Sequence, residues 1–283
     1  MKKLVITADS TFDMPVSLAN ELDIKVVASY VILDEEIDDY PDVKKERLFD
    51  YYNSTGKLPK TAAASPDDYV DFFKKYLDED TEIVHIAKSS KMSCCYDNAV
   101  KASQTLGNIY VVDSKSICGG SSLLAIMACK HRDLSAKELA TYLEGLTSKI
   151  HGSFVIESLE YLAKGGRCST VALLGANILR IRPQISIGLD GAMAVSDKFK
   201  VKYDMCITTY IDKIFKSIEK YDNETVIIGH TLLDENLLNK SVDYIKSKNY
   251  FKNVIIQEAG SAVSCHCGPN TFGMFVIEKN NEN

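Results

Sequence analysis

The sequence predicts an α/β protein of two domains, an N-terminal Rossmann-like parallel sheet and a C-terminal α+β domain with a mixed or antiparallel sheet. In the first half, short apolar runs alternate with helical patterns, which is typical of a parallel sheet. In the second half, two strand-like runs flank Asp190-Gly191, a hairpin signal that indicates antiparallel pairing. The length of 283 residues is about twice that of a typical domain.

Four strands are expected in the first half, at residues 4–8, 25–32, 82–87 and 109–113. The run Ser65-Pro66-Asp67-Asp68 predicts a helix start. It offers a hydroxyl cap, a proline at the first helical position, and carboxylates near the positive end of the helix dipole. We expect this helix to reach residue 77.

The second half is expected to open with strands 184–189 and 192–199, joined by a two-residue type I′ turn at Asp190-Gly191. A helix at 204–221, a strand at 225–228, a helix at 235–248, and strands at 254–258 and 272–278 follow. We place the domains at 1–155 and 156–283, packed directly with a cleft between them. Residues near 61–77 are expected to pack with the second domain.

Composition excludes several classes of function. The net charge of -6, with five arginines in the chain, gives no basic surface for a nucleic acid. The apolar run after the first residues is too short for a signal peptide, and the longest run, 123–129, is too short for a membrane span. We therefore expect a cytoplasmic protein with no integral membrane segment. Eight cysteines without a CxxC motif indicate reduced thiols.

Hydroxyl-rich turns follow three predicted strands, at Asp9-Ser10-Thr11, at residues 89–93, and from Asp113-Ser114 to Gly119-Gly120. The carboxyl ends of parallel strands face the ligand crevice, where helix N-termini favour an anion. Simple helix capping explains each turn equally well. The chain contains no nucleotide-phosphate loop, so no cofactor is expected and the anion would be a carboxylate or a single phosphate.

The stretch Cys265-His266-Cys267 invites a catalytic or zinc interpretation. On an extended segment, neighbouring side chains point to opposite faces, which argues against a Cys-His pair. No second pair of conventional zinc ligands is present, so no metal and no catalytic residue is assigned. Further upstream, Lys164-Gly165-Gly166-Arg167 lies between helical patterns, the second starting at Ser169, and is either a glycine helix end or an exposed basic tip for a partner or a phosphate.

Seven short motifs, in order along nearly the whole chain, resemble the DegV family of bacterial fatty-acid-binding proteins. The family patterns are a D-S-T turn after the first strand, a proline-initiated first helix, P-K-T-x-x-x-S-P, S-S-K-L-S-G-T-Y, V-x-D-S, L-E-Y-L-x-K-G-G-R and G-T-H-T-G-P. Their counterparts are Asp9-Ser10-Thr11, Pro15, Pro59-Lys60-Thr61 with Ser65-Pro66, residues 89–96, Val111-Val112-Asp113-Ser114, residues 159–167 and residues 264–269.

The resemblance implies a non-catalytic protein that holds one long-chain fatty acid, such as palmitate, between its domains. Thr61, Ser93 and His266 would bind the carboxylate. A separate ATP-dependent fatty acid kinase subunit, similar to dihydroxyacetone kinases, would convert it to an acyl phosphate for phospholipid synthesis, with Lys164 and Arg167 near that partner. The strand-end argument adds further pocket residues, namely Asp9, Ser10, Ser114, Gly119 and Gly120.

Two departures from the family patterns concern the carboxylate site. Cys94-Cys95 replaces Gly-Thr after Ser93, and cysteines replace the threonines on either side of His266. These four cysteines, Cys94, Cys95, Cys265 and Cys267, would crowd one neighbourhood and form a redox-sensitive or metal-binding cluster, unless they only fill space. The alternative functions are a thiol-dependent enzyme or redox protein that uses Cys265 or Cys267, and a carrier of another small anion.

Overall fold

The computed structural model describes residues 2–41, 45–170 and 181–279. Its first half is built on a sheet of four parallel strands in the order β2-β1-β6-β7. These strands are β1 (Lys3–Asp9), β2 (Ile24–Val27), β6 (Thr81–Ala87) and β7 (Ile109–Asp113). The predicted parallel α/β half is therefore confirmed.

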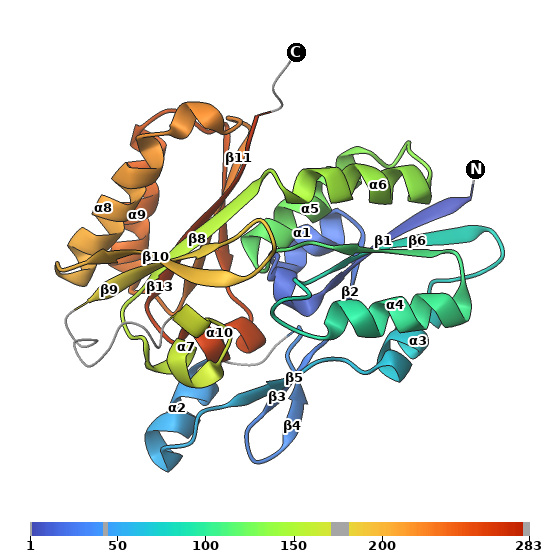
Figure 1. Ribbon diagram of the computed structural model, residues 1–283, viewed down its shortest axis with the longest axis horizontal. Coiled ribbons are helices and arrows are strands. Elements are labelled where there is room, and N and C mark those ends of the chain that lie inside the picture. The colour runs from blue at the N-terminus through green and yellow to red at the C-terminus, as the bar shows by residue number, and fades with distance from the viewer. Residues whose placement is uncertain (1, 42–44, 171–180, 280–283) are drawn as a thin grey trace.

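Helices cover both faces of this first sheet (Figure 1). They are α1 (Val16–Glu21), α3 (Pro66–Lys74), α4 (Cys95–Leu106), α5 (Gly119–Lys130) and α6 (Ala136–Thr147). On β1, Val5 packs with α3 and α4, whereas Ile6 packs with α5 and α6. Strands buried on both faces need apolar residues at successive positions, which is why they are short continuous apolar runs in the sequence.

The second half is built on a mixed sheet of six strands in the order β10-β9-β8-β13-β11-β12. The strands are β8 (Ile150–Ile156), β9 (Arg182–Ile187), β10 (Met193–Phe199), β11 (Thr225–Thr231), β12 (Asn253–Glu258) and β13 (Thr271–Ile277). Only the β11–β12 pair is parallel among the described strands of this sheet. The predicted boundary at residue 155 falls within β8, which belongs to the second sheet along its whole length.

Helix α5 lies between the two sheets, while α8 (Tyr203–Phe215) and α9 (Glu235–Ser247) cover the far face of the second sheet (Figure 1). The contact between α5 and the second sheet is close because α5 begins with Gly119. A Cβ atom at this position would lie 2.4 Å from the ring of Phe275 on β13. Only glycine lets the helix approach the sheet this closely.

A small third sheet joins the two halves at one side of the molecule (Figure 1). It has the order β4-β3-β5, from β3 (Tyr30–Ile32), β4 (Glu36–Asp38) and β5 (Lys60–Ala62). This sheet and α2 (Lys45–Thr55) contact α10 (Ser261–Cys267), which in turn packs against α7 (Glu160–Gly165). Residues 60–62 therefore lie beside the second half, whereas α3 packs on the first.

Several local predictions need correction. The single strand expected at 25–32 is two strands, β2 and β3. The chain leaves the first sheet at Ser29, because the backbone N–H of Ser29 donates to Asp39 Oδ1 at 2.8 Å. Helix α3 starts as predicted, with a capping box on Ser65, but ends at Lys74. The helix expected at 204–221 is α8 followed by a separate 3-10 turn, Ile218–Lys220.

The hairpin between β9 and β10 also differs from the prediction. The N–H of Gly191 donates to Gly188 O and the N–H of Gly188 donates to Ala192 O, both at 2.8 Å. Of the loop residues, Gly191 has a positive φ of 86° and Asp190 does not, whereas a type I′ turn needs both. The connection is a three-residue loop with a glycine bulge.

The segment around His266, expected to be extended, is helix α10. The helical segment expected from Ser169 lies largely outside the described residues. No helix among the described residues has the length and apolar character needed to cross a membrane.

Candidate functional site

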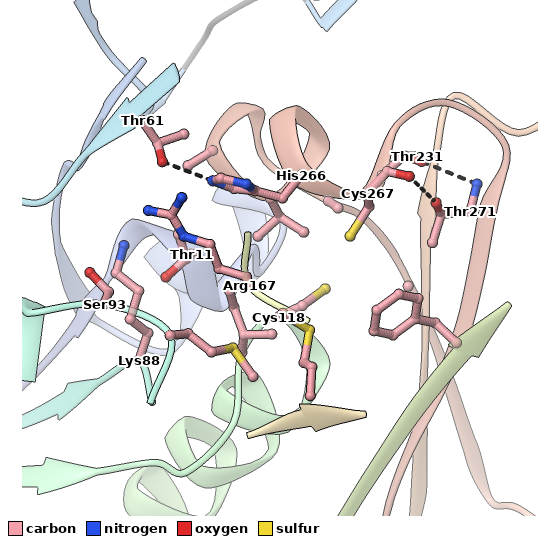
Figure 2. Close-up of a pocket in the computed structure, with 18 of the residues that line it drawn as sticks. Thr11, Thr61, Lys88, Ser93, Cys118, Arg167, Thr231, His266, Cys267 and Thr271 are labelled. Carbon is pink, nitrogen blue, oxygen red and sulfur yellow. Dashed lines mark hydrogen bonds between the residues drawn. The ribbon is translucent and has the colours of Figure 1, made fainter. Parts of the chain in front are cut away.

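A cavity of about 270 Å³ lies between the two halves. Residues from the first sheet's loops, from β5, from α10 and from the second sheet all contribute to its wall (Figure 2). Most of the wall is apolar, formed by residues that include Met92, Ile117, Phe154, Met193, Val263 and Phe275. Such a wall, with a few polar groups at defined places, is typical of a small-molecule site.

One end of the cavity is polar. Thr61 on β5 and His266 on α10 meet there, with Thr61 Oγ1 and His266 Nε2 at 2.9 Å. Ser93, in the loop between β6 and α4, lines the same cavity. Figure 2 shows these three side chains with Lys88 and Arg167 on the same side of the cavity. The structure thus gathers the three residues expected to bind a carboxylate around one cavity.

His266 is neutral at pH 7, because burial, with further contributions from Arg167 and Lys88, lowers its pKa to about 4. Its Nδ1 atom is buried and has no hydrogen-bond partner among the described residues. The ring lies directly against the backbone of Gly165, where a Cβ atom would be 2.5 Å from Nδ1. An unpartnered N–H is costly, so we place the ring proton on Nε2, donated to Thr61 Oγ1. That tautomer leaves the Thr61 hydroxyl free to donate to a ligand.

The residues of the motif Lys164 to Arg167 lie in different structural settings. Gly166 ends α7 with a φ of 69°, which confirms the predicted glycine helix end. Lys164 is exposed and pairs with Glu160 at 2.7 Å. Arg167 is also exposed, donates to Gly165 O at 2.7 Å, and lines the cavity. Only Arg167 of the two predicted contact residues therefore reaches the cavity wall.

Two other polar residues of the wall, Thr231 and Thr271, use their hydroxyls internally. The Thr231 hydroxyl donates to the carbonyl of Gly268, and the Thr271 hydroxyl donates to Cys267 O at 3.3 Å. Figure 2 places Thr231, Thr271 and Cys267 away from the group formed by Thr61 and Ser93. The hydroxyls of these two threonines therefore offer the cavity no free donor.

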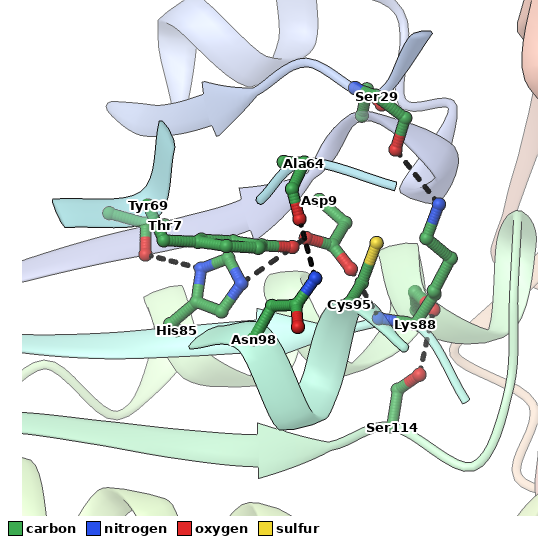
Figure 3. Close-up of polar contacts among 12 residues, drawn as sticks. Thr7, Asp9, Ser29, Ala64, Tyr69, His85, Lys88, Cys95, Asn98 and Ser114 are labelled. Carbon is green, nitrogen blue, oxygen red and sulfur yellow. Dashed lines mark hydrogen bonds and ion pairs between the residues drawn. The ribbon is translucent and has the colours of Figure 1, made fainter. Parts of the chain in front are cut away.

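The cavity wall does not include the five further residues expected in the pocket, which are Asp9, Ser10, Ser114, Gly119 and Gly120. Asp9 accepts hydrogen bonds from Tyr69 and from the N–H of Lys88, the latter at 2.8 Å (Figure 3). Ser10 donates to Asp39 Oδ2 at 2.9 Å, and Ser114 donates to Ser116 O at 3.0 Å.

The remaining two, Gly119 and Gly120, serve close packing. Gly119 faces Phe275, and a Cβ atom at Gly120 would lie 1.9 Å from Ser116 Oγ. Both begin α5 behind the cavity wall.

The four cysteines do not form one cluster. Cys94 is exposed at the cavity, whereas Cys95, the first residue of α4, is buried in the core cluster that α4 shares with α3. Cys265 packs with Val31 and Leu48, whereas Cys267 faces the cavity from another core cluster. Burial, as the main cause, raises the pKa of both Cys265 and Cys267 to about 12. Within the described residues no three His, Cys, Asp or Glu side chains are arranged to hold a metal ion.

Among the residues of the cavity wall that the sequence does not assign to a site are Thr11, Lys88 and Cys118. Thr11 belongs to the first hydroxyl-rich turn, but the strand-end argument selected its neighbours Asp9 and Ser10. Lys88 directly follows β6 at the carboxyl edge of the parallel sheet, so the same argument indicates it. Cys118 begins α5 with a φ of 53°, which no sequence motif signals.

Comparison with known proteins agrees with this architecture. Residues 3–279 match the model of a family described as uncharacterised proteins of the DegV family. A DegV domain-containing protein of Caldanaerobacter subterraneus subsp. tengcongensis is 29% identical over 284 residues, covering 99% of this chain and 100% of that protein. One from Clostridium acetobutylicum matches with the same identity and the same coverage.

Two solved structures share the fold. A fatty-acid-binding DegV family protein from Thermus thermophilus has a TM-score of 0.87 and 20% identity, covering 99% of this chain and 100% of that one. A stearic-acid-binding protein from Eubacterium ventriosum has a TM-score of 0.84 and 22% identity, covering 99% of each chain. On the match that spans residues 3–279, this chain belongs to the DegV family.

Proposed function

We propose that this protein binds one long-chain fatty acid in the cavity between its halves, with the carboxylate at Thr61, Ser93 and His266. The observation that carries the proposal is the cavity itself, which is mostly apolar and has hydroxyls and cationic side chains at one end. An acyl chain with a carboxylate head matches this distribution. The fatty acids bound by the structural relatives support the same ligand class.

The acyl chain supplies most of the affinity. Burial contributes about 0.8 kcal/mol per methylene, so a sixteen-carbon chain gains on the order of 10 kcal/mol before ordering costs. A buried carboxylate needs hydrogen-bond donors. The Thr61 and Ser93 hydroxyls are donors of this kind, and His266 orients the first of them. The exposed guanidinium of Arg167 adds a positive charge at the rim.

We further propose that the protein does not itself catalyse a reaction but presents the carboxylate to a separate kinase subunit in the cytoplasm. An ATP-dependent fatty acid kinase subunit, similar to dihydroxyacetone kinases, would form the acyl phosphate for phospholipid synthesis. Support comes from the polar end of the cavity, where Arg167 is exposed and Lys164 lies three residues away on the same surface segment. A partner that delivers a phosphoryl group there would meet both cations.

Native mass spectrometry of the purified protein tests the proposal. We expect a fatty acid to copurify, and the double variant Thr61→Ala with Ser93→Ala to retain at least about tenfold less, since each lost hydrogen bond to a charged group costs about 1.5–3 kcal/mol. The matched control is Ser54→Ala with Thr105→Ala, two exposed hydroxyls that bond to carbonyls of their own helices. A protein that binds no offered fatty acid refutes the proposal, and full retention by the first variant refutes the carboxylate assignment.

A further inference from the structure

A buried lysine faces the polar end of the cavity. Lys88 is only 7% exposed and directly follows β6, yet it lines the same cavity as Thr61 and Ser93. Figure 2 shows its ammonium group on the side of the cavity where the Ser93 hydroxyl lies. Arg167, by contrast, is exposed, so solvent screens its charge. Lys88 therefore exerts the less screened positive charge on this end of the cavity.

The ammonium group of Lys88 has few fixed partners. It donates a hydrogen bond to Ser29 Oγ at 2.9 Å (Figure 3) and has the Cys95 thiol as a second, weak partner, whereas an ammonium group carries three donors. Across residues 2–41, 45–170 and 181–279, no carboxylate oxygen lies within the 4.0 Å ion-pair distance of its Nζ atom. A buried cation with unused donors on a cavity wall is costly unless an anion enters the cavity.

The position of Lys88 is fixed by its surroundings. Its backbone N–H donates to Asp9 Oδ2 at 2.8 Å, and Asp9 is in turn held by Tyr69 and by His85, 3.3 Å away. Burial alone would lower the pKa of Lys88, but Cys95 and the more distant acids Asp9 and Asp39 raise it overall. The side chain is thus a charged, positioned donor at neutral pH.

We propose that Lys88 determines the head-group specificity of the cavity, so that it takes an ionised carboxylate in preference to a neutral head group on the same acyl chain. A carboxylate would accept the unused donors of Lys88 and neutralise its charge. A fatty alcohol has no charge to offer and would leave the ammonium without an anionic partner. The inference rests on the proposed fatty-acid function and adds a residue to its carboxylate site.

The test compares the binding of palmitate and of hexadecanol to the wild-type protein and to Lys88→Met, which keeps the side-chain length and removes the charge. We expect wild type to favour palmitate by at least about tenfold, and Lys88→Met to lose about 10- to 100-fold for palmitate but little for hexadecanol. The control is Lys91→Met, because Lys91 is exposed three residues further on and lies outside the cavity wall. Its selectivity should equal that of wild type.

A second readout needs no variant. The carboxyl ¹³C chemical shift of bound [1-¹³C]palmitate reports whether the acid is ionised. The wild-type protein should lower the pKa of the bound acid by at least about one unit, because a nearby opposite charge favours the ionised form. Equal affinity of wild type for acid and alcohol, or a bound acid that titrates as in water, would overturn the role of Lys88 alone. A wild-type protein that binds neither ligand would overturn the proposed function and this inference together.

Discussion

Replacement of Asp13 by Asn is expected to make the protein markedly less sensitive to alkaline pH. Asp13 lies between β1 and α1 and is 8% exposed. Neither carboxylate oxygen has a hydrogen-bond partner among the described residues, and a Cβ atom at Gly260 would lie 2.6 Å from Oδ1. Burial raises the pKa of Asp13 to about 7, although the nearby backbone N–H of Gly260 and the Cys118 thiol each act to lower it.

The sign follows from proton binding. Between the unfolded pKa of 3.8 and the folded value of about 7, the folded protein binds more protons at Asp13, so stability is lost as the pH rises through this window. These two values give a loss of about 1.7 kcal/mol at pH 5 and about 4 kcal/mol at pH 8. The free energy of unfolding of Asp13→Asn, relative to that of wild type, should therefore increase by about 2.5 kcal/mol between pH 5 and pH 8.

Urea unfolding at the two pH values measures this difference. Any pH-independent cost of the buried amide cancels. Asp39, whose pKa burial raises to about 6, titrates in both proteins, and its charge is one of the causes that raise the pKa of Asp13, so this coupling is part of the measured difference. Asp243→Asn, at an exposed position on α9, is the control and should leave the pH dependence unchanged. Equal pH dependence in wild type and Asp13→Asn would show that Asp13 is not a buried, unpartnered acid.

Three further outcomes are expected. Gly165→Ala places a methyl group against His266, so it should lower the free energy of unfolding in urea by about 1–3 kcal/mol and weaken fatty acid retention. Gly145→Ala should be neutral or stabilising, because no atom lies within 4 Å of the added methyl group. The His266 ring should titrate near pH 4 by NMR, so that stability falls as the pH drops from 6.5 towards 4; a midpoint at 6.5 or above contradicts the enclosed, neutral ring. Alkylation of the native protein should modify Cys94 well before Cys267, and rapid loss of the Cys267 thiol would instead favour a thiol-dependent activity.

The sequence predicted the two sheets because their strands are buried in regular patterns that a single chain displays. It did not predict the third sheet. The apolar run 25–32 does not signal that β2 and β3 belong to different sheets, since that depends on the bonds of Ser29 to Ser10 and Asp39. Likewise, Asp190-Gly191 indicates a hairpin, but the loop length depends on where the pairing of β9 and β10 stops.

The position of the cavity between the two halves could be predicted from the sequence, but the residues of its wall only in part. Thr61, Ser93 and His266 were indicated by ordered motifs, and the structure brings them to one cavity. Asp9 and Ser114 lie at the predicted strand ends, but tertiary partners occupy their side chains, and local sequence does not specify such partners. The sequence does not distinguish Lys88, because a lysine after a strand is usually a solvated residue.

The departures from the family patterns alter the chemistry of the cavity rather than its backbone. At Cys94, where the family has glycine, φ is −83°, which any residue adopts, so the replacement needs no backbone change. Cys95, in place of threonine, accepts a hydrogen bond from the Ser93 hydroxyl at 3.3 Å and raises the pKa of Lys88. A thiol is a weak acceptor, so it leaves Ser93 and Lys88 more available to a ligand anion than a hydroxyl would. In the proposed carboxylate site, the substitution thus favours the ligand anion as the partner of both groups.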